Sequence, residues 1–92
     1  MKKITYFFIK TCPYCINANT AIDELFAENE KYREIEIERI DEEENTDIVD
    51  TYDYYYVPCM FIGDSKIYEA NPSQNFDDIK ASVKRVFDLA IQ

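Results

Sequence analysis

Two cysteines separated by two residues, Cys12 and Cys15, are the residues of this chain best suited to chemistry. They follow a β-branched and aromatic run and precede apolar residues at helical spacing, so we expect the pair where a strand meets a helix. At such a position, unpaired backbone N–H groups and the helix dipole favour a thiolate, and the thiol pKa can fall well below about 8.5. We therefore predict Cys12 as a nucleophile for thiol–disulfide exchange.

The residues around Cys12 have predicted supporting roles. Cys15 lies three residues further on, where Cβ atoms about 5 to 6 Å apart allow a disulfide, so it is expected to resolve a mixed disulfide. Pro13 suits the first turn of the helix and is also expected to contact the substrate. Lys10 is expected to stabilise the thiolate or a substrate carboxylate, and Tyr14 to contact the substrate. Four more tyrosines divide between packing and a platform for an extended substrate: Tyr52, Tyr54, Tyr55 and Tyr56.

Two other interpretations of the cysteine pair stay open at this point. A Cys-x-x-Cys pair is also half of a zinc site. Because the chain has no histidine and Cys59 is its only other thiol, a closed site would need a carboxylate or a second chain. A metal or iron–sulfur module using Cys12, Cys15 and Cys59 is the competing hypothesis, and a pair of buried structural cysteines is the third. Cys59 itself is expected to be a buried, small hydrophobic residue.

The composition limits the partners. Ten basic and 19 acidic side chains give a net charge of −9, which argues against nucleic acids and anionic membranes and favours basic proteins. The absence of histidine excludes hydrolase triads that depend on imidazole. The apolar run near the N-terminus is short and ends at Lys10, and no run approaches the roughly 18 apolar residues that span a bilayer. We expect a soluble, cytoplasmic monomer.

The remaining sequence predicts the scaffold that positions the cysteines. Its elements follow the order β-α-β-α-β-β-α, with an edge strand second and Asn75 capping the last helix. We expect one α/β domain over residues 1–92, with a four-stranded mixed sheet flanked by three helices. The expected elements are strand 2–9, helix 13–29, strand 33–40, short helix 46–52, strands 57–62 and 66–69, and helix 76–91.

Two motifs resemble those of the glutaredoxins, within the wider thioredoxin-like group. The Cys-Pro-Tyr-Cys sequence at residues 12–15 matches the dithiol glutaredoxin signature letter for letter, and Val57-Pro58 followed by Phe-Ile-Gly at 61–63 is similar to the second signature. The resemblance covers residues 2–91 and implies the thioredoxin fold. It further implies a cis Pro58 packed opposite the cysteines, and a backbone at Val57 that pairs with the substrate as an added strand.

The same resemblance implies a disulfide reductase that binds no cofactor and takes electrons from a reductase or from glutathione. One segment departs from the family pattern. Where glutaredoxins usually have a Gly-Gly pair and then a dipeptide that holds a glutathione carboxylate, this chain has Glu69 to Ser73. Glu69 is expected to repel that carboxylate, with Ser73, Gln74 and the N–H groups near Asn75 as partial replacements. We therefore expect a protein or peptide disulfide as the substrate.

Overall fold

The computed structural model describes residues 1–92 and is built on one sheet with the strand order β2-β1-β3-β4. The central strand β1 (Ile4–Phe8) pairs in parallel with β2 (Ile37–Asp41) and antiparallel with β3 (Cys59–Ile62). The last strand, β4 (Ser65–Glu69), forms an antiparallel hairpin with β3. The mixed four-stranded sheet predicted from the sequence is confirmed, with β2 at an edge.

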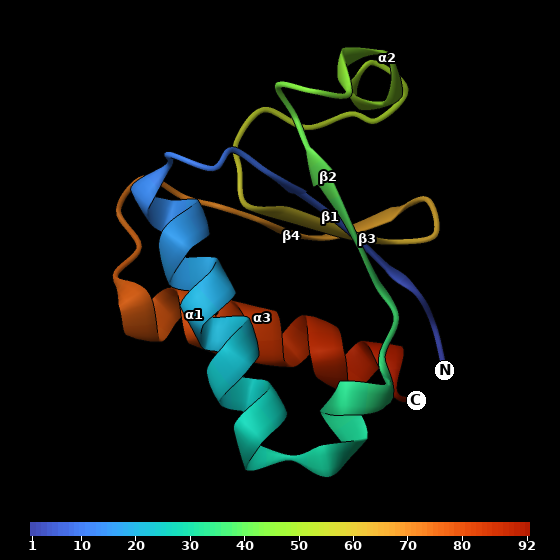
Figure 1. The fold of residues 1–92 in the computed structure, drawn as a ribbon, viewed down its shortest axis with the longest axis vertical. Helices are drawn as coiled ribbons and strands as arrows, with labels where there is room; N and C mark the ends of the chain where they lie inside the picture. The colour runs from blue at the N-terminus through green and yellow to red at the C-terminus, as the bar shows by residue number, and fades with distance from the viewer.

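Helices cover both faces of this sheet (Figure 1). The long helices α1 (Pro13–Glu28) and α3 (Phe76–Ala90) lie together on one side, and the single turn α2 (Thr46–Val49) lies on the other. The Asn75 side chain accepts the Asp78 N–H at 2.8 Å, and the Asp78 carboxylate accepts the Asn75 N–H at 3.2 Å. This capping box confirms the predicted start of α3.

The side chains of β1 alternate between the two faces of the sheet, and so they contribute to two separate core clusters. Ile4 and Tyr6 point to α1 and α3 and belong to a cluster of 15 buried residues. Phe7 points to the opposite face and belongs to a cluster of four, with Ile40, Cys59 and Phe61. Cys59 is fully buried there, as the sequence predicted for a small hydrophobic residue.

The predicted strand 33–40 is wrong in its first half. Residues Glu30–Glu34 form a 3-10 helix, η1, and β2 begins only at Ile37. The side chain of Asn29 accepts the Lys31 N–H at 3.0 Å and so begins this turn, while Ile35 at its end is buried in the larger core cluster. The alternating glutamates and isoleucines that predicted one strand therefore lie partly at the end of η1 and partly in β2. The predicted helix 46–52 also ends early, at Val49.

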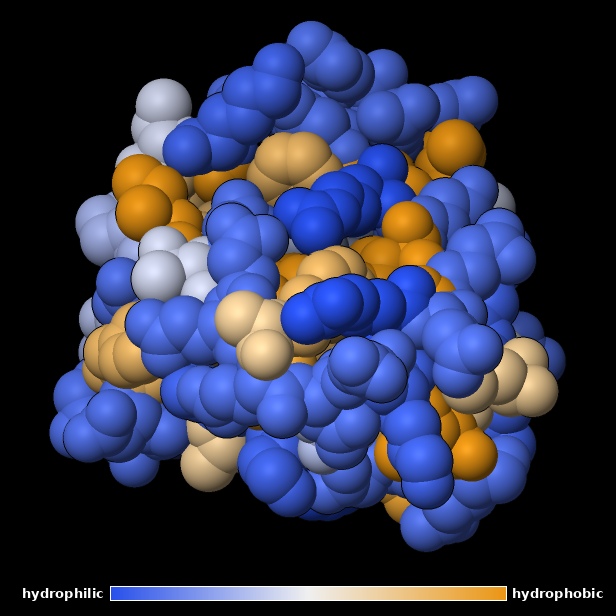
Figure 2. Space-filling model, turned by 60° about the horizontal axis from the view of Figure 1, so that its bottom comes forward, coloured by the Kyte–Doolittle hydropathy of each residue, from blue (hydrophilic) through white to orange (hydrophobic).

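The surface is mostly hydrophilic where Figure 2 shows it. This view brings the bottom of Figure 1 forward, and hydrophobic residues appear there only as small separate patches. The high share of charged residues, 32% of the chain, accounts for this pattern. No helix of this structure combines the length and the apolar character needed to cross a membrane.

Candidate active site

The two motif cysteines lie at the start of α1 and differ in exposure. Cys12 is the N-cap residue, and Pro13 is the first residue of the helix, as predicted. The Cys12 side chain makes no capping hydrogen bond, and the first turn contains no acidic residue. Cys12 is partly exposed, whereas Cys15 is fully buried. The geometry thus presents one sulfur to a partner and keeps the other behind it.

The environment of Cys15 favours the protonated thiol. Burial raises the pKa of Cys15 from 9.0 to about 12, and the nearby Cys12 acts in the same direction. The backbone N–H of Ile9 donates to Cys15 Sγ at 3.5 Å and offsets part of this effect. Cys15 therefore carries its proton near neutral pH, with one N–H group in place for the negative charge that forms when the proton leaves.

The segment before β3 meets the cysteine pair. The Val57–Pro58 peptide bond is cis, as the family resemblance implied, and Pro58 is buried. The Cys12 thiol lies 4.0 Å from the carbonyl oxygen of Val57 and is oriented to donate to it. The fold thus brings together residues 45 positions apart in the sequence.

Lys10 lies near the motif but is held by acidic side chains. Its ammonium is 3.6 Å from a carboxylate oxygen of Asp41, at the end of β2, and 3.6 Å from one of Glu44. The lysine side chain is exposed, so these ion pairs contribute little to stability. The predicted role of Lys10 towards the thiolate or a substrate carboxylate stays a prediction, with two neighbouring carboxylates as competitors.

Tyr14 connects the motif to the loop between β4 and α3, because its hydroxyl donates to the carbonyl of Pro72. The backbone donors of that loop are largely satisfied within it. The Asn71 N–H donates to Gln74 Oε1 at 3.2 Å, and the Ser73 N–H donates to Asn71 Oδ1 at 3.0 Å. The loop that was expected to supply replacement donors for an anionic ligand therefore uses several of them itself.

Glu69 has a role that the sequence did not reveal. Its Oε2 accepts the N–H groups of Tyr55 at 2.5 Å and Tyr56 at 2.9 Å, and its Oε1 accepts the Lys66 ammonium at 2.9 Å. Burial acts to raise the pKa of Glu69, but these backbone N–H groups and Lys66 together hold it below its ordinary value. The carboxylate is therefore ionised and engaged. Only the pairing of β3 with β4 brings it there, and no local sequence signal indicates it.

The four neighbouring tyrosines divide into two pairs. Tyr52 and Tyr54 pack against Phe7, each with ring centroids 4.8 Å apart, and both also contact the Phe61 ring. Tyr55 and Tyr56 are instead 85% and 54% exposed. Tyr52 and Tyr54 therefore have a packing role. The contact role stays a prediction for Tyr55 and Tyr56, which directly precede Val57.

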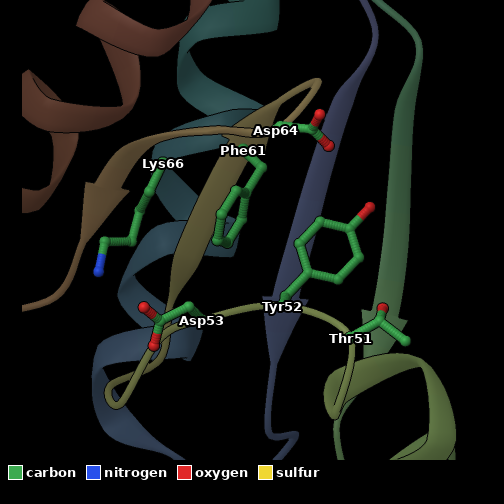
Figure 3. A pocket seen from close by; sticks show the side chains of 6 residues that line it. All are labelled: Thr51, Tyr52, Asp53, Phe61, Asp64 and Lys66. Atoms are coloured by element: carbon green, nitrogen blue, oxygen red, sulfur yellow. The ribbon is translucent and has the colours of Figure 1, made fainter.

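The largest pocket lies away from the cysteines, on the sheet face that carries the smaller core cluster. It measures about 600 Å³ and contains neither Cys12 nor Cys15. Figure 3 shows the Tyr52 and Phe61 rings close together in it, with ring centroids 4.9 Å apart. The partly exposed Cys12 thus lies apart from this cavity. The pocket is lined by Thr51, Tyr52, Asp53, Phe61, Asp64 and Lys66.

The competing metal hypothesis finds no donor set within one chain. No group of three or more cysteine, aspartate or glutamate side chains is arranged to hold a metal ion. Cys59 lies in the smaller core cluster, where burial raises the pKa of its thiol to about 12. A metal would need the thiolate form of this cysteine, so the structure provides no support for Cys59 as a third ligand.

Comparison with solved structures identifies the fold. The chain is similar to the oxidised thioredoxin from Plasmodium falciparum, with a TM-score of 0.66 and 13% identity over 98% of this chain and 81% of that one. Thioredoxin 1 from Thermosipho africanus gives a TM-score of 0.55 and 21% identity, over 98% of this chain and 99% of that one. A mutant thioredoxin from Halobacterium salinarum gives a TM-score of 0.62 and 17% identity, over 98% of this chain and 74% of that one. A search of curated proteins found no match.

At these identities the likeness shows the fold alone, and the predicted thioredoxin fold is confirmed. A comparison with protein-family models adds the family. The model described as Glutaredoxin matches residues 4–67, which include the motif, β1, α1 and the β3–β4 hairpin up to Ile67. Family and fold together support a thiol–disulfide oxidoreductase kind of function. Because the match covers most of the 92 residues, the chain belongs to the glutaredoxin family.

Proposed function

We propose that this protein reduces disulfides of proteins or peptides through a Cys12/Cys15 dithiol–disulfide cycle. The observation that carries the proposal is the asymmetry of the two sulfurs. Cys12 is partly exposed at the start of α1, whereas Cys15 is buried one helical turn behind it. No bound cofactor takes part, and an external donor returns the electrons. Membership of the glutaredoxin family supports this chemistry.

The cycle consists of two exchange steps. The Cys12 thiolate attacks one substrate sulfur, so that a Cys12–substrate disulfide forms, the substrate S–S bond breaks, and the released thiolate takes a proton. Cys15 then loses its proton and attacks Cys12 Sγ, which forms the Cys12–Cys15 disulfide and releases the second substrate thiolate. Two electrons pass from the dithiol to the substrate. The donor supplies two electrons and two protons to restore the dithiol.

The high pKa of Cys15 sets the order of these steps. With a pKa of about 12, Cys15 is a thiol at neutral pH and is a poor nucleophile until a proton acceptor is available. The thiolate that leaves the substrate can take this role. The N–H of Ile9, 3.5 Å from Cys15 Sγ, stabilises the charge that develops on the attacking sulfur.

The surface beside Cys12 suits an extended peptide. In this proposal the Val57 carbonyl accepts a main-chain N–H from a strand that carries the disulfide, and its distance of 4.0 Å from the Cys12 sulfur supports this role. Tyr55 and Tyr56 provide exposed rings next to this edge. Pro13 and Tyr14 complete the proposed contact surface, although the Tyr14 hydroxyl is already bonded to the next loop.

The choice of substrate follows from the loop after β4. Glutaredoxins generally use glutathione and disulfide substrates. Here the Asn71 and Ser73 N–H groups are satisfied by side chains of the same loop. A glutathione carboxylate therefore finds few free donors. We propose a protein or peptide disulfide as the substrate, with a reductase or glutathione as the electron donor.

Turnover of a peptide disulfide tests the proposal. The assay uses two donor systems, glutathione with its reductase, and thioredoxin reductase with NADPH. We expect Cys12→Ser to abolish turnover and Cys15→Ser to accumulate a mixed disulfide, detectable by mass spectrometry. Cys59→Ala is the matched control, since it removes the third thiol and leaves the motif intact. Normal turnover by Cys12→Ser would refute the assignment, and the donor that supports the wild type identifies the electron source.

A further inference from the structure

Glu69 binds the chain segment that leads to the active site. This residue ends β4, and one of its carboxylate oxygens accepts two successive backbone N–H groups, those of Tyr55 and Tyr56. Neither tyrosine belongs to a strand or helix, so no ladder hydrogen bond is available to hold them. Hydrogen bonds to an ionised carboxylate are stronger than those between neutral groups. The side chain of Glu69 thus replaces the missing regular structure.

A second hydrogen bond fixes the same segment on its other side. The Ala70 N–H donates to the carbonyl of Pro58 at 3.0 Å. Val57 therefore lies between two anchors on adjacent residues, the Glu69 carboxylate before it and the Ala70 amide after it. The Val57 carbonyl is the group 4.0 Å from the Cys12 sulfur.

A segment that is already ordered binds a partner with a smaller entropic penalty. Ordering a loop and its side chains on binding reduces affinity, and preorganisation removes part of that loss. Without Glu69, the backbone N–H groups of Tyr55 and Tyr56 would have only water as a partner, and no side chain would order this exposed segment. A substrate strand would then have to order the segment before it could pair with Val57.

We propose that Glu69 is a positioning residue that holds the 55–57 segment in the conformation that pairs with a disulfide-bearing peptide. The proposal rests on the proposed function, because it concerns the substrate edge of the same site. Glu69 does not touch the reacting sulfurs. Its removal is therefore expected to weaken substrate binding and to leave the chemistry of Cys12 intact.

Kinetics of Glu69→Ala and Glu69→Gln test this role. Charge-assisted hydrogen bonds contribute enough that we expect the KM for a peptide disulfide to rise about tenfold in Glu69→Ala, with kcat within about twofold of wild type. Glu69→Gln keeps one acceptor oxygen, so its KM is expected to lie between those of the wild type and Glu69→Ala. Lys66→Gln is the matched control, because it removes the ion pair and keeps the two backbone bonds. Its KM is expected to stay within about twofold of wild type.

Two further readouts separate positioning from general stability. Alkylation of Cys12 by iodoacetamide is expected to proceed at the wild-type rate in both Glu69 variants. Amide hydrogen exchange at Tyr55 and Tyr56 is expected to accelerate in Glu69→Ala and to stay unchanged in Lys66→Gln. This exchange measurement reports on the hydrogen bonds between Glu69 and the two tyrosine N–H groups without any substrate.

The results that overturn the inference are distinct from those that overturn the function. An unchanged KM in folded Glu69→Ala, or unchanged exchange at Tyr55 and Tyr56, overturns the positioning role while wild-type turnover still stands. An equal rise of KM in Lys66→Gln also overturns it, because the ion pair would then be the active element. Failure of the wild type to turn over the peptide overturns both proposals.

Discussion

The buried thiol of Cys59 gives a sharp prediction about stability and pH. Burial raises its pKa from 9.0 to about 12 in the folded protein, and the Glu69 carboxylate acts in the same direction. In the unfolded chain the thiol returns to its ordinary pKa. Above pH 9 the unfolded state therefore loses this proton first. The stability that the neutral buried thiol contributes is fully present below about pH 9 and is lost as the pH rises towards about 12.

The size of the effect follows from this difference. At about pH 10, ionisation of Cys59 in the unfolded state alone stabilises that state by about 1.4 kcal/mol, relative to pH 7. Cys59→Ala removes the thiol and leaves a small cavity, whose cost of about 1 kcal/mol does not depend on pH. The wild type should therefore be about 1 kcal/mol more stable than Cys59→Ala at pH 7 and about 0.4 kcal/mol less stable at about pH 10, a change of about 1.4 kcal/mol.

Urea unfolding of both proteins under reducing conditions measures this advantage at each pH. The comparison cancels the titration of tyrosines and lysines, which both proteins share. At each pH the wild type and Cys59→Ala must show the same slope of unfolding free energy against urea concentration. The difference between their unfolding free energies then reflects stability alone. An advantage that stays constant between pH 7 and pH 10 would refute the conclusion that the fold raises the Cys59 pKa.

Three further predictions concern groups that hold the scaffold of the site. Tyr6→Phe removes a hydroxyl that donates to Asn19 at 2.9 Å, and urea unfolding should show a loss of about 1 kcal/mol; no loss would contradict the bond. Asn75→Ala removes the capping box with Asp78, and calorimetry should show a melting temperature lower by about 4 to 8 °C, for about 1 kcal/mol; an unchanged value would argue against the cap. Gly63→Ala places a side chain at φ 59°, so chemical denaturation should show a loss of about 1 kcal/mol, and a gain would exclude backbone strain there.

Much of the fold could be predicted because local signals agree with it. The run through β1 is β-branched and aromatic, and both of its faces are buried, as Tyr6 and Phe7 show on opposite sides. The change from this run to apolar residues at helical spacing predicted that the cysteines lie at the start of a helix, where Pro13 is the first residue. These features depend on neighbours in the sequence, and a sequence pattern contains that information directly.

The parts that could not be predicted depend on contacts between distant residues. Ile35 alternates with glutamates as a strand residue would. It lies instead at the end of η1, a 3-10 helix that Asn29 caps at its start, and packs in the larger core cluster. The hydrogen bonds of Glu69 to the backbone of Tyr55 and Tyr56 were not predicted either, because they depend on the β3–β4 register. A single sequence shows which residues are charged, but the partners of those charges come from the tertiary fold.

The separation of 45 residues between Cys12 and Val57 has a consequence for synthesis on the ribosome. Chains emerge from the N-terminus, so Cys12, Cys15 and the helix α1 that follows them are made before the later elements. The Val57 edge instead requires β3 to pair with β1, and its anchors at Glu69 and Ala70 emerge later still. A nascent chain therefore has its reactive thiols before it has the surface that selects their substrate.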